Sequence, residues 1–130
     1  MSERIPQRQE IAAENKWSIE DIYATDELWE ADYAKAKSFA EKIATYKGLL
    51  STSSEKLLEY MKLDDELSVL LDSLVNYAQR KNDEDTRVAK YQDMVSRVEM
   101  LYVEIAGAAS FVTPELLSIS DEDMERLYKE

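Results

Sequence analysis

The stretch VAKYQDMVSRVEMLYVEIAGAA, residues 88–109, carries the clearest pattern in the chain. Its apolar side chains are spaced alternately three and four residues apart, as on one face of an α-helix. This face consists of Val88, Tyr91, Val95, Val98, Tyr102, Ile105 and Ala109, and a second line beside it consists of Met94, Leu101 and Ala108. Two adjacent lines make a stripe broader than a two-stranded coiled-coil seam. We therefore predict that this helix contacts more than one neighbour.

Two further segments show the same helical spacing. A first long helix is predicted from a cap at Thr25 or Asp26 to Gly48, a natural C-cap, and a second from about Ser54 to Arg80. Their predicted buried faces consist of Trp29, Tyr33, Ala36, Ala40 and Ile43 in the first, and of Tyr60, Leu63, Leu67, Leu70, Leu71, Leu74 and Ala78 in the second.

Short cap motifs are predicted at several helix starts. A Ser or Thr side chain can accept a hydrogen bond from the free backbone N–H groups there, often with an acid three residues later. The predicted caps are Ser18 with Asp21, Thr52 with Glu55, Thr113 before Pro114, and Ser120 with Asp123. Around Ser18, the side chain of Trp17 would pack on Ile22, and Trp17 and Tyr23 would dock this turn onto the bundle.

Length and composition fit a single helical domain. The 130 residues are 45% hydrophobic and 34% charged, which is typical of a globular protein. Only two glycines and two prolines occur, whereas β-hairpins and glycine-rich phosphate loops need more glycine. We predict an all-α fold, an antiparallel bundle of three long helices flanked by short capped helices. Residues 1–16 should form an extended arm, and residues 17–130 a helical domain truncated at its C-terminus.

The charge balance argues against several classes of partner. A net charge of −12 repels nucleic acid and anionic membrane surfaces. The sequence has no continuous apolar run of about 18 residues and no signal peptide at its start. The chain has no cysteine, which suits the cytosol. We expect a cytoplasmic protein with no nucleic-acid partner and no membrane partner.

The sequence offers no catalytic or metal centre of a common type. The chain has no histidine, which excludes Ser-His-Asp triads and His-Glu-x-x-His zinc sites. Asp64, Asp65 and Glu66 are adjacent on a predicted helix, where neighbours point about 100° apart, so they form a solvated face. Residues 82–85, Asn-Asp-Glu-Asp, lack the glycine and glutamate spacing of a calcium loop, so an acidic turn is favoured over a calcium site. We predict no catalytic, cofactor-binding or metal-ligating residue in this chain.

The eight tyrosines are the remaining candidates for ligand contact. Most are predicted in the core or at its edge, with the hydroxyl reaching outward. A few could line a groove for an extended peptide, and the sequence leaves open which ones. The tyrosines are Tyr23, Tyr33, Tyr46, Tyr60, Tyr77, Tyr91, Tyr102 and Tyr128.

An ordered set of motifs resembles the N-terminal domain of oligoendopeptidase F and its relatives. The motifs are WSIEDIYATDELWE at residues 17–30, VNYA at residues 75–78 and SFVTPELLSI at residues 110–119. An arginine-bearing arm, IPQRQEI at residues 5–11, precedes the first motif. The resemblance extends over nearly the whole chain.

The resemblance implies a non-catalytic part of a zinc metallopeptidase. In that family an all-helical N-terminal domain precedes a larger catalytic domain, where a His-Glu-x-x-His helix binds zinc and activates water. None of the zinc or catalytic residues can be placed here, since this chain has no histidine. The implied function is a lobe that helps to enclose a channel for oligopeptide substrates, inactive without the missing C-terminal catalytic domain. A stand-alone helical interaction module, which binds an amphipathic partner along its stripe, is the alternative.

Overall fold

The computed structural model describes residues 4–130, so the first three residues of the predicted arm lie outside it. Every regular element in the described part is helical, which confirms the all-α prediction. Three short 3-10 helices come first, namely η1 (Arg8–Glu10), η2 (Ala13–Asn15) and η3 (Ile19–Asp21). The α-helices are α1 (Asp26–Lys37), α2 (Phe39–Ala44), α3 (Ser54–Glu84), α4 (Ala89–Ala108), α5 (Val112–Leu117) and α6 (Asp121–Lys129).

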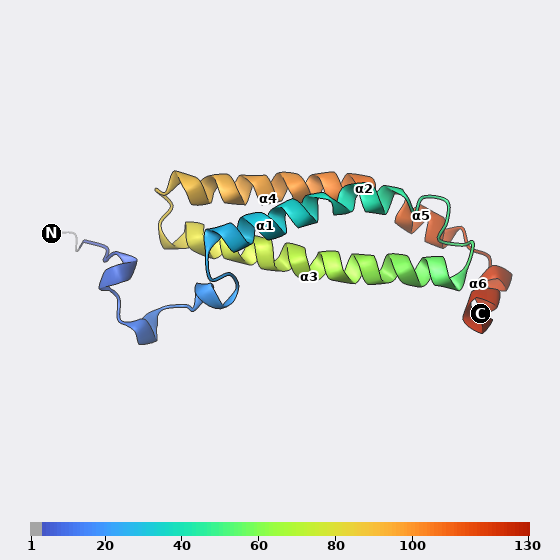
Figure 1. The fold of residues 1–130 in the computed structure, drawn as a ribbon, viewed down its shortest axis with the longest axis horizontal. Helices are drawn as coiled ribbons and strands as arrows, with labels where there is room; N and C mark the ends of the chain where they lie inside the picture. The colour runs from blue at the N-terminus through green and yellow to red at the C-terminus, as the bar shows by residue number, and fades with distance from the viewer. Residues whose placement is uncertain (1–3) are drawn as a thin grey trace.

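Three passes of the chain form the elongated body of the molecule (Figure 1). Helices α1 and α2 run along it in succession, α3 returns beside them, and α4 runs back along α3. Helix α1 lies mainly against α3, whereas α2 lies mainly against α4. The α1–α2 segment therefore crosses one side of the α3–α4 pair obliquely, and α4 contacts three helices, as its broad stripe predicted.

The first predicted helix is two helices, which corrects the prediction of three uninterrupted ones. At Ser38 the backbone N–H bonds to Lys35 O, three residues back, and the hydroxyl also donates to that carbonyl at 2.7 Å. Such bonding of a serine hydroxyl to the preceding turn competes with the α-helical ladder and bends helices. Helix α2 then ends at Ala44, before Gly48, which has the left-handed φ of +80° expected of a glycine that ends a helical segment.

The second predicted helix is longer than expected. Helix α3 continues through Glu84, and only residues 85–88 separate it from α4. Its acidic end is neutralised locally, because Arg80 lies 3.7 Å from Asp83 and Arg8 of the arm forms an ion pair with Glu84. Asp83 and Glu84 therefore lie in the last turn of α3 instead of in the predicted acidic turn.

The cap predictions are confirmed at two positions and wrong at three. The hydroxyls of Thr25 and Ser120 accept hydrogen bonds from Leu28 N at 3.4 Å and Asp123 N at 3.1 Å. Ser53, not Thr52, caps α3, by accepting from Lys56 N at 3.2 Å. Thr113 lies inside α5, which begins one residue earlier, at Val112.

The predicted cap at Ser18 is also wrong. Its side chain makes no capping hydrogen bond, and the turn that follows is the 3-10 helix η3. Trp17 is 78% exposed and does not dock this turn, whereas Tyr23 is buried and does. Ile19, which was not expected in this role, is also buried, so one aromatic and one aliphatic residue hold the turn on the body.

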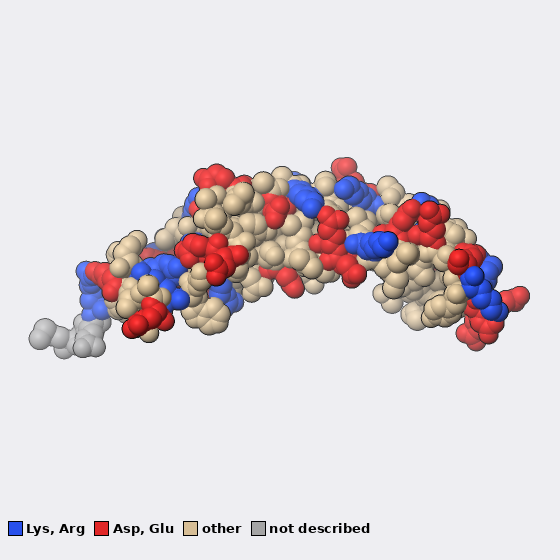
Figure 2. All heavy atoms as spheres, turned by 60° about the horizontal axis from the view of Figure 1, so that its bottom comes forward, with Lys and Arg blue, Asp and Glu red and all other residues tan. Residues whose placement is uncertain are grey.

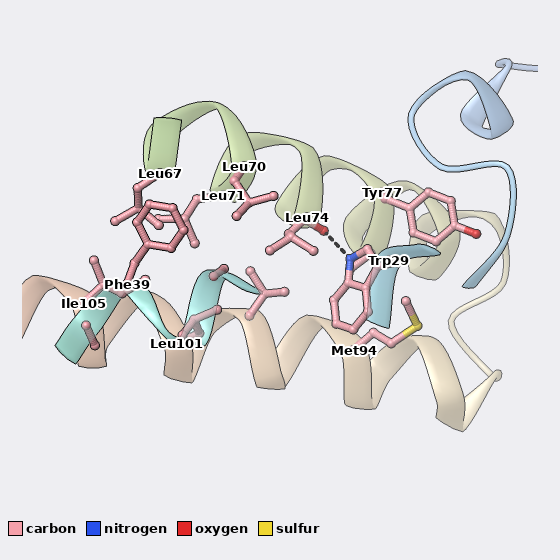
Figure 3. Packing of buried hydrophobic residues seen from close by; sticks show 14 of the residues in the cluster. Trp29, Phe39, Leu67, Leu70, Leu71, Leu74, Tyr77, Met94, Leu101 and Ile105 are labelled. Carbon is pink, nitrogen blue, oxygen red and sulfur yellow. Dashed lines mark hydrogen bonds between the residues drawn. The ribbon is translucent and has the colours of Figure 1, made fainter. Parts of the chain in front are cut away.

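The core lies where α1 and α2 meet α3 and α4 (Figure 3). Trp29 and Met94 pack at one end of the view, and Phe39, Leu67 and Ile105 pack at the other. Most residues that the helical spacing predicted as buried are in this cluster or packed against it. Tyr102 is the clear exception on α4, since it is 59% exposed.

Candidate functional site

A groove runs between α3 and α4 and consists of two adjoining cavities of about 340 and 200 Å³ that share Tyr102. We call it the α3–α4 groove. The first cavity is lined by Val75, Ala78, Gln79, Val95, Val98, Glu99 and Tyr102, and the second by Asp64, Leu67, Ser68, Leu71, Asp72, Tyr102, Ile105 and Ala106.

Helical geometry places this groove away from α1. On α4, the side chain of Arg97 faces α1, where it forms a bidentate ion pair with Glu30 at 2.6 and 2.7 Å. Glu99 follows Arg97 by two positions and so points about 200° around the helix from it. Since Glu99 lines the groove, the groove lies on the side of the α3–α4 pair that α1 leaves open.

The groove has an apolar floor and only acidic charges. Its charged lining residues are Asp64, Asp72 and Glu99, and no lysine or arginine lines either cavity. Such a surface can bind an apolar segment flanked by positive charges. It holds no nucleophile paired with a base, and within residues 4–130 no group of three acids could hold a metal ion.

The apolar character of α4 extends beyond the groove. The segment Ala89–Leu117 contains an 18-residue stretch with a mean hydropathy of 1.3, of which only 11% is buried. Length and composition of this kind suffice to cross a membrane, but core helices of globular proteins share them. Met100 and Val103 are each 72% exposed on this helix. The segment from α4 to α5 thus presents apolar side chains that the rest of the described chain leaves exposed.

The tyrosines divide as predicted into a core majority and an exposed minority. Six of them are buried or half-buried. Five of these six donate a hydrogen bond from the hydroxyl to a carboxylate or a backbone carbonyl at the edge of the core. The exposed ones are Tyr102 and Tyr128, at 59% and 84%. Of these two, Tyr102 lines the groove. The sequence had assigned Tyr102 to the buried stripe, since it has the same spacing as its buried neighbours.

A half-buried carboxylate joins three helices beside the core. Asp26, at the start of α1, accepts hydrogen bonds from the hydroxyls of Tyr77 at 2.7 Å and Tyr91 at 3.4 Å, and lies 2.6 Å from Lys90 Nζ. Burial alone would raise the pKa of Asp26, but the bonds from Lys90, Tyr77 and Tyr91 hold it below its usual value. Burial and the Asp26 carboxylate raise the pKa of Tyr77. Both shifts move the pKa further from pH 7, so neither group is suited to exchange protons as an acid–base catalyst. The junction instead fixes the three helices relative to one another.

Another cavity, of about 380 Å³, lies between the N-terminal arm and the end of α3. The guanidinium of Arg8 occupies its wall, where it pairs with Glu84 and also lies 3.1 Å from both Glu20 and the carbonyl of Trp17. Lys81 lies 3.5 Å from Glu20. These charges neutralise one another, so the cluster attaches the arm to α3 and leaves little unpaired charge for a ligand.

The acidic stretch that was expected to be solvated lies on the surface. Asp64, Asp65 and Glu66 are all exposed on α3, and Glu66 pairs with Lys35 of α1 at 2.7 Å. Acidic side chains are spread along the visible face of the molecule, with basic ones between them (Figure 2). Asp64 differs from its two neighbours in lining the groove.

Comparisons with known proteins identify relatives over most of the chain. The chain is 32% identical to oligopeptidase PepF of Bacillus subtilis over 127 residues, which is 98% of this chain and 19% of the relative. It is 36% identical to the group B oligopeptidase PepB of Streptococcus agalactiae, over 91% of this chain and 20% of that protein. It is 39% identical to an oligoendopeptidase F homolog of Lactococcus lactis, over 88% of this chain and 19% of the relative.

The fold is also found in a solved structure. The crystal structure of oligoendopeptidase-F from Enterococcus faecium matches with a TM-score of 0.71 and 24% identity, over 81% of this chain and 21% of that one. No protein-family model matches the chain. The chain thus spans about a fifth of the length of the curated relatives it matches.

Proposed function

We propose that this chain is a non-catalytic helical lobe from the N-terminal region of an oligoendopeptidase F-like peptidase, since almost the whole chain matches such enzymes. In this proposal the lobe helps to enclose the channel that admits short peptides. The observation that carries it is the extent of the match: almost the whole chain aligns, yet with only about a fifth of each relative. The remaining four-fifths would supply the peptidase chemistry.

The zinc of the proposed enzyme belongs to that remaining part. A His-Glu-x-x-His helix binds zinc through two histidines and activates water through the glutamate, and this chain has no histidine. Its partners would be the catalytic part of the same enzyme and the oligopeptide substrates. We place this enzyme in the cytosol, which suits a chain without cysteine.

The packing of the lobe supports a role as a rigid wall. Trp29 is fully buried and bonded to α3, and Asp26 is held by side chains of both α3 and α4. Contacts of this kind fix α1 relative to the long helices. A wall that limits the length of bound peptides needs such rigidity, since a yielding wall would admit longer chains.

A chimera tests the proposal. The matched region of Bacillus subtilis PepF is replaced by this chain, and cleavage of a short and a long quenched fluorescent peptide is compared with that by a deletion variant without the region. We expect the chimera to cleave with the native preference for short peptides, and the deletion variant to lose activity or that preference. The isolated 130-residue chain supplied with zinc should cleave neither peptide.

Two results would contradict the proposal. One is cleavage by the isolated chain that survives further purification. The other is a deletion variant that keeps both the activity and the length preference of the intact enzyme, because the lobe would then contribute nothing to the channel. A stand-alone interaction module would become the better account in the second case.

A further inference from the structure

We propose that the α3–α4 groove is the surface on which the remainder of the peptidase docks, through an amphipathic helix whose apolar face is flanked by lysine or arginine side chains. This inference rests on the proposed function, since it takes the remainder of the enzyme as the partner. It adds which face of the lobe is covered and by what kind of segment.

Under the proposed function, the greater length of the relatives makes an intramolecular partner available. The relatives are about five times as long as the part matched here, so most of their residues lie outside this structure. Apolar surface is available for such a partner, because the first cavity of the groove is lined mainly by apolar side chains and Tyr102 is 59% exposed. Exposed apolar patches of this sort commonly mark an interface.

The dimensions of the groove fit a helix. Its lining on α3 extends from Asp64 to Gln79, fifteen helical steps of about 1.5 Å each, or roughly 22 Å. A helix of about four turns has that length. Tyr102 lies where the two cavities meet, so its ring would contact the middle of such a helix. Tyrosine suits this position, since it offers a large apolar face and keeps a hydroxyl for the rim.

The charges of the groove select a basic partner. Asp64 and Asp72 lie on its α3 side and Glu99 on its α4 side, with no cation among the lining residues. An acidic helix would meet like charges along both rims, whereas flanking lysines or arginines would pair with them. The same acids disfavour the headgroups of an anionic membrane.

Photo-crosslinking in the Bacillus subtilis PepF chimera tests the docking surface. Tyr102→p-benzoylphenylalanine places a crosslinker in the groove at an exposed position, where the change should not disturb folding. Met100→p-benzoylphenylalanine is the matched control, since Met100 is 72% exposed on the same helix and lines neither cavity. The crosslinked peptides are identified by mass spectrometry.

We expect Tyr102→p-benzoylphenylalanine to crosslink to one segment of the catalytic part, with helical apolar spacing and at least one lysine or arginine. The Met100 variant should give no crosslink to that segment. Glu99→Lys, added to the Tyr102 variant, should reduce the crosslink yield, whereas Glu104→Lys, an exposed acid of α4 outside the groove, should not.

Several results would overturn the inference. They are crosslinks only to residues of this chain, equal crosslinking from Tyr102 and Met100, no crosslink to the catalytic part, a captured segment without basic residues, or equal yields with Glu99→Lys and Glu104→Lys.

Flotation of the isolated chain with phosphatidylserine vesicles, lost in Tyr102→Glu, would also overturn the inference in favour of a membrane surface. An active chimera with any of these results would refute the docking surface alone. A deletion variant that keeps both the activity and the length preference, together with the expected crosslink in the chimera, would refute the proposed function and retain the docking surface.

Discussion

The indole Nε1 of Trp29 donates a hydrogen bond of 2.9 Å to the backbone carbonyl of Leu74, and so joins α1 to the middle of α3 (Figure 3). Trp29 is 0% exposed, and its ring stacks on Tyr33 with the centroids 5.2 Å apart. The guanidinium of Arg97 lies over the same ring from α4, 5.2 Å from its centroid. One side chain therefore carries contacts to both long helices.

Trp29→Phe should destabilise the chain by about 2 kcal/mol or more, because it removes the buried donor and leaves a cavity. Trp17→Phe is the matched control, since Trp17 is 78% exposed. This substitution should change the free energy of unfolding by no more than about 0.5 kcal/mol. Urea unfolding at neutral pH measures both free energies. Equal effects of the two changes would show that Trp29 does not hold α1 in place.

Asp26→Asn should reduce stability at pH 7 by about 1.5–3 kcal/mol, the range for hydrogen bonds to a charged group. The folded-state pKa of Asp26 lies below its ordinary value of 3.8, so the ionised group stabilises the fold above that pH. This contribution is lost as the pH falls through the lower, folded-state pKa. The difference between the two proteins should therefore shrink in acid, as urea unfolding at several pH values would measure. A difference that persists unchanged at low pH would refute the role assigned to the carboxylate.

The two glycines should respond in opposite directions to alanine. Gly48 has a φ of +80°, so Gly48→Ala should cost about 1–2 kcal/mol of backbone strain. Gly107 lies in α4 without a positive φ, and an added methyl group meets no atom within 4 Å. Gly107→Ala should therefore stabilise the chain by about 0.5–1 kcal/mol. Thermal unfolding of both variants shows whether each substitution raises or lowers the melting temperature. Shifts of the two melting temperatures in the same direction would contradict the different backbone roles assigned to the two glycines.

Ser53→Ala should cost about 1 kcal/mol, because its hydroxyl caps α3. Ser18→Ala should have little effect, since the Ser18 side chain makes no capping bond. Chemical unfolding compares the two directly. A larger loss from Ser18→Ala than from Ser53→Ala would mean that the capping roles are reversed.

The buried face was predictable because burial follows helical spacing. Trp29, Ile43, Leu74 and Leu101 are all below 2% exposed and were all identified from the intervals between apolar residues. Each lies near the centre of a stripe, where some neighbour must cover it whatever the details of packing. The all-α fold followed from the same periodicity.

Other features depend on local hydrogen bonds and on tertiary packing, which the spacing of apolar residues does not reveal. At Ser38, where α1 ends, the hydroxyl donates to the carbonyl of Lys35, whereas the hydroxyl of Ser73 donates to the carbonyl of Val69 within the uninterrupted α3. The presence of a serine therefore does not locate the break. In the sequence Ser-Thr-Ser-Ser, residues 51–54, several residues have cap chemistry, and the path of the chain into α3 selects Ser53. Tyr102 belongs to a stripe wider than its neighbours cover, and spacing does not show which edge of such a stripe stays open.

The short connection between α3 and α4 has a consequence for the order of folding. These helices make the most extensive contact in the molecule, and only residues 85–88 join them. A short connection costs little loop-closure entropy, and contacts near in sequence favour rapid folding.

We expect an α3–α4 hairpin to form in the transition state, with α1 docking afterwards through Trp29. In stopped-flow kinetics Trp29→Phe should then mainly accelerate unfolding, whereas Leu101→Ala should mainly slow folding. The reverse pattern would show that α1 takes part in the nucleus.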